Sequence, residues 1–106
     1  MNFSSLTAIT PVDGRYSSKT KELQVYFSEF GLIRYRVLVE VEYLIALVNT
    51  GIQPLDQFPK DKFESLRSIY LNFSEEDALW IKNTERTTNH DVKAVEYYLK
   101  EKLEKL

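Results

Sequence analysis

The sequence contains no cysteine and only one histidine, His90. Without thiol groups the chain can form neither disulfides nor thiolate metal sites. A single imidazole cannot hold zinc unless several carboxylates converge on it. No metal site is therefore expected.

Long apolar runs and a basic amino-terminal segment are also absent. The residues after Met1 read NFSSLTAITPVDG, which is unlike a signal peptide, and no stretch is apolar over the length needed to span a membrane. We therefore expect a cytoplasmic protein without a membrane partner. Lys and Arg number 14 against 16 Asp and Glu, for a net charge of -2. Nucleic acid is not an expected partner, because there is no basic field to attract phosphate backbones.

The residues that are present have the balance of a globular domain. The chain has 106 residues, of which 43% are hydrophobic and 28% are charged. A chain of this length buries roughly two thirds of its unfolded surface, which is enough for one core. We therefore predict that residues 1–106 form a single domain.

Glycine and proline are scarce, with three of each, and the segments between them show helical spacing. We predict an all-α domain of about five helices. The first is expected from about Lys19, with an apolar face made of Leu23, Tyr26, Phe27 and Phe30. The third is expected from near Lys60, with an apolar face made of Phe63, Leu66, Tyr70 and Phe73.

The second predicted helix, residues 30–48, has a conflicting local pattern. Its RYRVLVEVEY stretch alternates polar and apolar residues as a strand does. The unbroken segment is about twenty residues long, whereas a strand usually has ~5–6. We interpret it as a long helix that is buried on most sides and ends near Gly51. Arg36 and Glu40 lie four residues apart and can pair on it.

The SEED sequence at 74–77 indicates the start of a fourth helix. Ser74 is placed to accept an early backbone N–H and Asp77 to bond back to the backbone of Ser74, as in a capping box. The helix that follows carries Leu79, Trp80 and Ile81. Trp80 and the tyrosines fall at helical spacing, so we expect them in the core rather than in a platform that stacks a ligand.

A fifth helix is predicted up to the end of the chain. Its apolar stripe is made of Val92, Val95, Leu99, Leu103 and Leu106, and the pairs outside it are Glu96–Lys100 and Glu101–Lys105. No glycine, proline or asparagine stops this helix. We therefore interpret the chain as a truncated fragment of a longer protein.

The hexapeptide RTTNHD, residues 86–91, concentrates hydrogen-bonding groups where this last helix begins. In one interpretation Thr88 or Asn89 is the N-cap, and Asp91 lies in the first turn, where negative charge suits the helix dipole. In the other, unpaired backbone N–H groups hold a phosphate or carboxylate, and His90 adds a donor. Caps are far commoner than binding sites, so the residues alone favour capping.

A second polar pair follows the PVDG turn at 11–14. In that turn Asp13 supplies an acceptor and Gly14 tolerates positive φ. Arg15 can capture an anionic oxygen with two hydrogen bonds, and Tyr16 adds a hydroxyl group. Exposed arginines near turns are usually only solvated, so this pair does not by itself indicate a site.

Three stretches taken together resemble a known family. They are SSLTAITPVDGRY near the start, FSEFGLIRYRVLVEVEYL after it, and FSEEDALWIKNTERTTNHDVKAVEYYLKEKL at the end. They resemble the N-terminal domain of the bacterial adenylosuccinate lyase family, which belongs to the fumarase/aspartase superfamily. The resemblance covers nearly the whole chain, and only residues 51–62 contribute little to it.

The resemblance implies an enzyme of purine synthesis. Such an enzyme eliminates fumarate from adenylosuccinate, giving AMP, and from the succinylated carboxamide ribotide, without a metal or organic cofactor. In this family an arginine and a tyrosine after the turn contact the nucleotide, chiefly its phosphate, and they match Arg15 and Tyr16. The asparagine, histidine and aspartate that line the site match Asn89, His90 and Asp91. The hexapeptide is then expected both to cap the helix and to bind substrate.

The resemblance also implies which functional groups lie elsewhere. The family's general acid, a histidine, and its general base, a serine on a mobile loop, belong to later segments. No catalytic residue is therefore expected here apart from an assisting role of His90, and the fragment is expected to be inactive. Family enzymes are homotetramers, whereas the fragment is expected to be a monomer or a weak dimer. The alternative function is a helical interaction module whose last helix docks on a partner.

Overall fold

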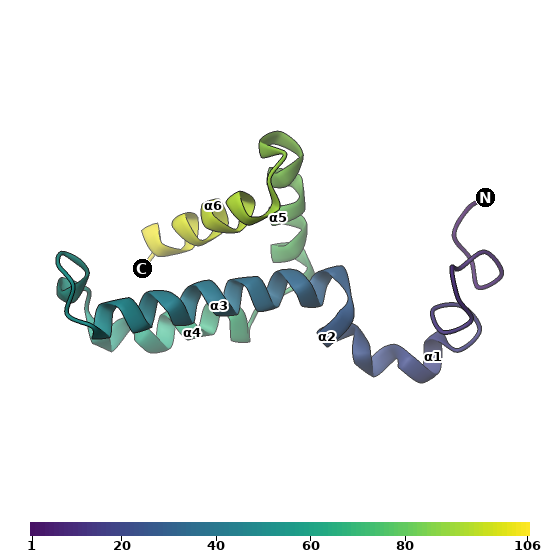
Figure 1. Ribbon diagram of the computed structural model, residues 1–106, viewed down its shortest axis with the longest axis horizontal. Helices are drawn as coiled ribbons and strands as arrows, with labels where there is room; N and C mark the ends of the chain where they lie inside the picture. The colour runs from purple at the N-terminus through teal and green to yellow at the C-terminus, as the bar shows by residue number, and fades with distance from the viewer. The chain divides into compact units, whose positions relative to one another are not determined.

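A computed structural model describes all of residues 1–106, and its elements are helices joined by turns (Figure 1). The all-α class predicted from the sequence is confirmed. By its internal contacts the chain divides into two compact units, Met1–Leu32 and Ile33–Leu106. None of the helices is long and apolar enough to cross a membrane.

The first unit is made of turns and short helices. The helices are α1 (Ser17–Thr20), the 3-10 helix η1 (Lys21–Leu23) and α2 (Gln24–Phe27). The prediction of a single continuous helix from about Lys19 is therefore wrong. Its apolar stripe is not covered, since Phe27 is 82% exposed and Leu23 and Tyr26 are also exposed. Short helices depend on tertiary packing of their apolar face, so an uncovered stripe does not maintain a continuous helix.

The turn at 11–14 forms as expected, but its glycine is needed for another reason. Asp13 Oδ1 accepts hydrogen bonds from the Thr10 backbone N–H (3.0 Å) and hydroxyl (3.1 Å). Gly14 does not have a positive φ, so the turn does not use the tolerance that glycine offers. It is buried, and a Cβ atom there would lie 2.6 Å from the carbonyl oxygen of Ser5. The glycine allows a close approach between two backbone segments.

The long helix α3 (Glu29–Asn49) confirms the helical interpretation of the RYRVLVEVEY stretch. One stripe at spacings of three and four is buried, made of Ile33, Val37, Val41, Ile45 and Val48. The expectation that α3 is buried on most sides is wrong, because Val39 is 61% exposed and Tyr43 is 62% exposed. Gly51 follows the helix with φ of 80°, and its N–H donates to the Val48 carbonyl at 3.3 Å. The predicted glycine end of the helix is confirmed.

Two 3-10 turns, η2 (Leu55–Gln57) and η3 (Lys60–Lys62), lead into α4 (Phe63–Leu71), which lies beside α3 (Figure 1). An ion pair joins the two helices, with Arg67 Nε 2.9 Å and Arg67 Nη2 3.3 Å from the two carboxylate oxygens of Glu42. The Tyr70 hydroxyl donates to the same carboxylate at 2.6 Å. These hydrogen bonds lower the pKa of Glu42 below its ordinary value, and the bond from Arg67 has the largest effect.

The helices α5 (Glu75–Thr88) and α6 (Asp91–Glu104) form a tight pair. The buried residues of this pair are Ala78, Ile81, Ala94, Val95 and Tyr98. The predicted stripe on α6 is therefore only partly right, because Val92 and Leu106 are exposed while Ala94 and Tyr98 are buried. Burial is the main cause that raises the pKa of Tyr98 above its ordinary value.

The aromatic residues do not all enter the core as predicted. Tyr70 and Tyr98 are buried, and the Tyr98 ring meets the edge of Phe73 at 5.7 Å and of Trp80 at 5.8 Å between centroids. Trp80 is 38% exposed, and Tyr97 is also exposed. A helical spacing of aromatic residues indicates a shared face but does not say which part of that face another helix covers.

Of the two ion pairs predicted on the surface of α6, one forms as expected. Lys105 lies 3.5 Å from Glu101, as expected for a pair four residues apart. Glu96 instead pairs with Lys93, three residues before it, at 3.0 Å. Both arrangements place side chains on neighbouring turns of the same helix face, so the sequence alone does not choose between them.

Candidate functional site

The polar corner at residues 86–91 is positioned by α5, whose start is firmly capped. The Ser74 hydroxyl oxygen accepts from the Asp77 backbone N–H at 3.2 Å, and the Asp77 carboxylate accepts from the Ser74 backbone N–H at 2.9 Å. The predicted capping box is confirmed. From this start α5 runs without interruption to the corner.

The end of α5 falls later than expected, and this changes the roles of the corner residues. The helix includes Thr88, and Asn89 ends it in the left-handed conformation with φ of 53°. The Asn89 N–H donates to the Glu85 carbonyl at 2.7 Å. The prediction of Thr88 or Asn89 as N-cap of the next helix is therefore wrong. Asparagine tolerates the left-handed region better than most residues, so it can reverse the chain here as glycine does elsewhere.

His90 is the N-cap of α6. Its Nδ1 accepts a hydrogen bond from the Lys93 backbone N–H at 3.2 Å. The Thr88 hydroxyl bonds to both polar groups of the His90 backbone. It accepts from the His90 N–H at 3.2 Å and donates to the His90 carbonyl at 3.1 Å. An imidazole that accepts through Nδ1 is neutral and carries its proton on Nε2. The His90 side chain is exposed, so its Nε2–H can donate to a ligand.

The first backbone amides of α6 are mostly occupied. The Val92 N–H donates to the Asp91 carboxylate at 2.8 Å, and the Ala94 N–H donates to the His90 carbonyl at 3.2 Å. With Lys93 bonded to His90, three amides of the first turn have partners. The expectation of an open amide end for an anion is therefore wrong in this structure. A ligand at this corner would meet side chains first.

Asp91 is held by a residue of α3. The Arg36 guanidinium donates from Nη1 to Asp91 Oδ2 at 2.7 Å, across 55 positions of sequence. This bond, followed by that of the Val92 N–H, holds the pKa of Asp91 below its ordinary value. The expected pairing of Arg36 with Glu40 is wrong. Sequence analysis missed this role of Arg36 because a neighbour on the same helix offered a partner.

Arg15 and Tyr16 lie in the other unit and form a local pair. The guanidinium carbon of Arg15 is 4.7 Å from the centroid of the Tyr16 ring, and both side chains are exposed. The Tyr16 N–H donates to the Pro11 carbonyl at 2.8 Å, so the turn fixes the backbone of this pair. An exposed guanidinium beside a phenol can bind an anionic oxygen.

A hollow of about 530 Å³ lies beside the corner, between α5 and α6. It is lined by Trp80, Asn83, Thr84, Thr87, Thr88 and Tyr97. Counted from Trp80, the other α5 residues lie three, four, seven and eight positions further on, a helical spacing that the sequence contained. The hollow was not predicted, because the helical spacing of Trp80 favours a place in the core.

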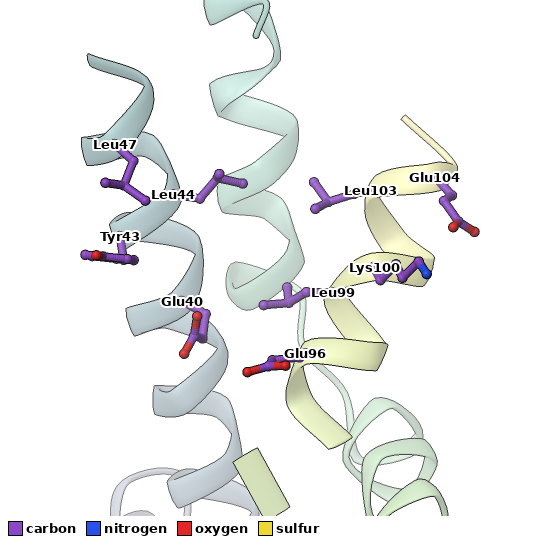
Figure 2. A pocket seen from close by; sticks show the side chains of 9 residues that line it. All are labelled: Glu40, Tyr43, Leu44, Leu47, Glu96, Leu99, Lys100, Leu103 and Glu104. Carbon is purple, nitrogen blue, oxygen red and sulfur yellow. The ribbon is translucent and has the colours of Figure 1, made fainter. Parts of the chain in front are cut away.

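A second concave surface, the α3–α6 groove, has a volume of about 500 Å³ and is mainly apolar. Figure 2 shows Leu44 of α3 and Leu99 and Leu103 of α6 pointing into the space between the two helices. Glu40 and Glu96 lie together at one end of the groove. No cluster of histidine and carboxylate side chains in the chain could hold a metal ion.

Comparison with known proteins gives matches over nearly the whole chain. It is 55% identical over 104 residues to adenylosuccinate lyase of Vibrio cholerae serotype O1, a match that covers 97% of the chain and 23% of that enzyme. The chain is homologous to the adenylosuccinate lyases. It is also 54% identical over 104 residues to the enzyme of Escherichia coli K12, covering 97% of the chain and 23% of the enzyme.

The similarity extends beyond bacteria. The chain is 51% identical over 105 residues to adenylosuccinate lyase of Dictyostelium discoideum, covering 97% of the chain and 22% of that enzyme. The chain thus spans less than a quarter of the length of these relatives. No protein-family model matches it. The resemblance inferred from the sequence is confirmed as homology to a portion of adenylosuccinate lyase.

Proposed function

We propose that this chain is the N-terminal, substrate-binding part of an adenylosuccinate lyase. The observation that carries the proposal is 51–55% identity to three such lyases over 97% of the chain. The enzyme would eliminate fumarate from adenylosuccinate to give AMP, and from the succinylated carboxamide ribotide in the same way. It would work in the cytoplasm, where purines are made, and without a metal or organic cofactor.

The substrate of this reaction is an anion, and Arg15 and Tyr16 supply groups that bind one. A guanidinium offers several N–H donors in one plane, which suits the oxygen atoms of a phosphate. The exposed position of Arg15 next to the Tyr16 ring leaves it accessible to a nucleotide. We assign these two residues to the phosphate of the substrate.

In the second unit, we assign Asn89, His90 and Asp91 to substrate binding. Because Nδ1 of His90 is used by the helix cap, its Nε2–H is the group that meets substrate. The two hydrogen bonds between the Thr88 hydroxyl and the His90 backbone keep that backbone in place. A donor whose position is fixed before substrate binds loses little entropy on binding, and this favours recognition.

The elimination itself requires groups that this chain does not provide. A base must remove a proton from carbon while an acid protonates the departing amine. The chain has one histidine, and that imidazole is already used as a helix cap. We therefore propose that the acid and the base come from the rest of a longer polypeptide, and that His90 assists them. Complete sites would be assembled in a homotetramer.

Fumarate release by the full-length protein tests the proposal. Purified protein should convert adenylosuccinate to AMP and fumarate, which can be followed by absorbance. The 106-residue chain alone should release no fumarate, because it lacks the acid and the base. A full-length protein without this activity would overturn the proposed function.

The second candidate function is a helical interaction module without a catalytic role. The α3–α6 groove favours it, because its leucine side chains offer an apolar surface to another helix (Figure 2). Titrating the chain with AMP while following backbone amide signals separates the two candidates. Changes at residues 15–16 and 88–91 support nucleotide binding, whereas a full-length protein that neither binds AMP nor releases fumarate supports the module.

A further inference from the structure

Arg36 connects the middle of the long helix α3 to the first turn of α6. The contact between Arg36 Nη1 and Asp91 Oδ2 is 2.7 Å long, compared with 2.9 Å for the Arg67–Glu42 pair between α4 and α3. Asp91 follows His90 directly, and its other carboxylate oxygen accepts from the Val92 N–H at 2.8 Å. The carboxylate is therefore fixed at both oxygens, one by α3 and one by its own helix.

This arrangement links Arg36 to the imidazole through a short series of contacts. Asp91 is anchored to α3, the first turn of α6 is anchored to Asp91, and His90 is bonded to that turn through the Lys93 N–H. Arg36 donates its hydrogen bond to Asp91, whereas the imidazole accepts its hydrogen bond from the Lys93 N–H. Arg36 would act on a ligand through Asp91 and the turn.

The charge of Arg36 matters as much as its position. A carboxylate in the first turn of α6 would repel an anionic substrate that approaches His90. The guanidinium offsets that charge at contact distance, so the pair does not present a net negative charge to the ligand. An aspartate that anchors the turn is then compatible with a site for anions.

We infer that Arg36 is a positioning residue of the substrate site: it fixes and neutralises Asp91, and thereby holds His90 where an anionic substrate meets it. The inference rests on the proposed function, because it concerns the same site. It assigns to α3 a part in substrate binding that neither the hexapeptide nor the Arg15–Tyr16 pair suggests.

The chain contains a matched control for this inference. Arg67 of α4 also bonds to a carboxylate on another helix, Glu42 of α3, at 2.9 Å. That bridge involves none of the residues of the polar corner. Removing either arginine breaks one bridge between helices, but only one of the two bridges ends at the proposed site.

Kinetics of full-length variants provide the main test. Arg36→Ala should lower kcat/KM about tenfold, chiefly by raising KM, since the displaced corner binds substrate less well. Arg67→Ala should leave kcat/KM within about twofold of the wild type. Equal losses in the two variants would overturn the inference, because they would indicate a general effect of losing a bridge.

Two further variants test whether Arg36 acts through Asp91. The Arg36 contact is a single hydrogen bond, so Arg36→Lys should recover most of the lost kcat/KM. In an Asp91→Asn background, Arg36→Ala should add little further loss, because the residue through which it acts has already changed. Independent, additive losses would instead show that Arg36 acts by another route.

A measurement that does not depend on activity separates this inference from the proposed function. Hydrogen exchange of the amides at residues 90–94, followed by mass spectrometry, should become faster in Arg36→Ala and stay unchanged in Arg67→Ala. An inactive wild type would refute the proposed function, while exchange would still decide whether Arg36 holds the turn. Unchanged exchange in Arg36→Ala would overturn the inference.

Discussion

The helices α5 and α6 both begin with a side chain that accepts a backbone N–H three residues on, but their caps differ in chemistry. Ser74 and Asp77 bond to each other's backbone, so the α5 cap is complete within four residues. His90 caps α6 through Nδ1, and the neighbouring Asp91 bonds to Arg36 on α3. The start of α6 therefore depends on another helix, whereas the start of α5 does not.

The Ser74 cap only stabilises its helix, whereas the chemistry of the His90 cap suits a second role in binding a ligand. Serine and aspartate are among the preferred capping residues, and histidine is not. If this corner needed only a cap, a serine would satisfy the same N–H. An imidazole adds a donor at Nε2 that serine lacks. The less favourable cap therefore occurs where a donor to a ligand is proposed.

The largest expected effect comes from exchanging the imidazole for a better cap. His90→Asn keeps an acceptor for the Lys93 N–H but removes the Nε2–H donor. In the full-length lyase that we propose, kcat/KM for adenylosuccinate should fall about 100-fold or more, as for the loss of a catalytic proton donor or acceptor. The thermal midpoint should stay the same or rise. Ser74→Asn serves as the control and should leave kcat/KM unchanged. A His90→Asn enzyme with normal kinetics would show that His90 is only a cap.

Removing the α5 cap should lower stability and leave kcat/KM unchanged. Ser74→Ala deletes the oxygen that accepts from the Asp77 N–H, and it should lower the free energy of unfolding by about 1–2 kcal/mol. Urea denaturation of wild type and variant, measured side by side, gives this value. Ser74→Thr keeps a hydroxyl group and should recover most of the loss. No destabilisation in Ser74→Ala would mean that the capping box is not formed in solution.

The left-handed residue between the two helices should have a smaller effect. Asn89 has φ of 53°, where a Cβ is unfavourable, so Asn89→Ala should cost about 1 kcal/mol and Asn89→Gly close to nothing. Gly51 is a matched position, with φ of 80° and open space on the side where a Cβ atom would stand. Gly51→Ala should therefore destabilise the chain by a similar amount in the same urea experiment. A clearly smaller cost at Asn89 would contradict the left-handed turn.

The smallest expected effect is on the stability of the chain at acidic pH. Arg36 lowers the pKa of Asp91 in the folded chain, so this pair contributes stability above the ordinary carboxyl pKa and loses it as pH falls through the lowered value. Arg36→Gln should raise the pKa of Asp91 and weaken the dependence of stability on pH in that acidic range. Carboxyl carbon shifts measured by NMR would report the pKa. Ser74→Ala should leave the pKa of Asp91 unchanged.

The start of α5 was predictable because its cap is local. Ser74 and Asp77 are three residues apart, and no other part of the chain needs to be in place for their bonds to form. The helical state of α3 was predictable from its length, and its end from Gly51. In each case the signal lies within one helical turn or within one unbroken segment.

The start of α6 was not predictable in the same way. Thr88 and Asn89 are better caps than His90 by preference, but α5 continues through Thr88 and uses Asn89 for its own end. The partner of Asp91 lies 55 residues earlier, so no local pattern indicates it. The first predicted helix failed for a related reason, because helical spacing does not reveal whether a stripe such as that ending at Phe27 will be covered.

The link between α5 and α6 consists of Asn89 and His90 alone. Asn89 reverses the chain through its left-handed conformation, so one additional residue at this link would change the direction in which α6, with His90 at its start, leaves α5. A substitution at Asn89 or His90 changes one side chain and leaves the direction of the chain in place. An insertion or deletion changes that direction. Among natural variants we expect insertions and deletions to collect around residues 51–59 and to be missing from residues 86–91, whatever side chains those variants carry.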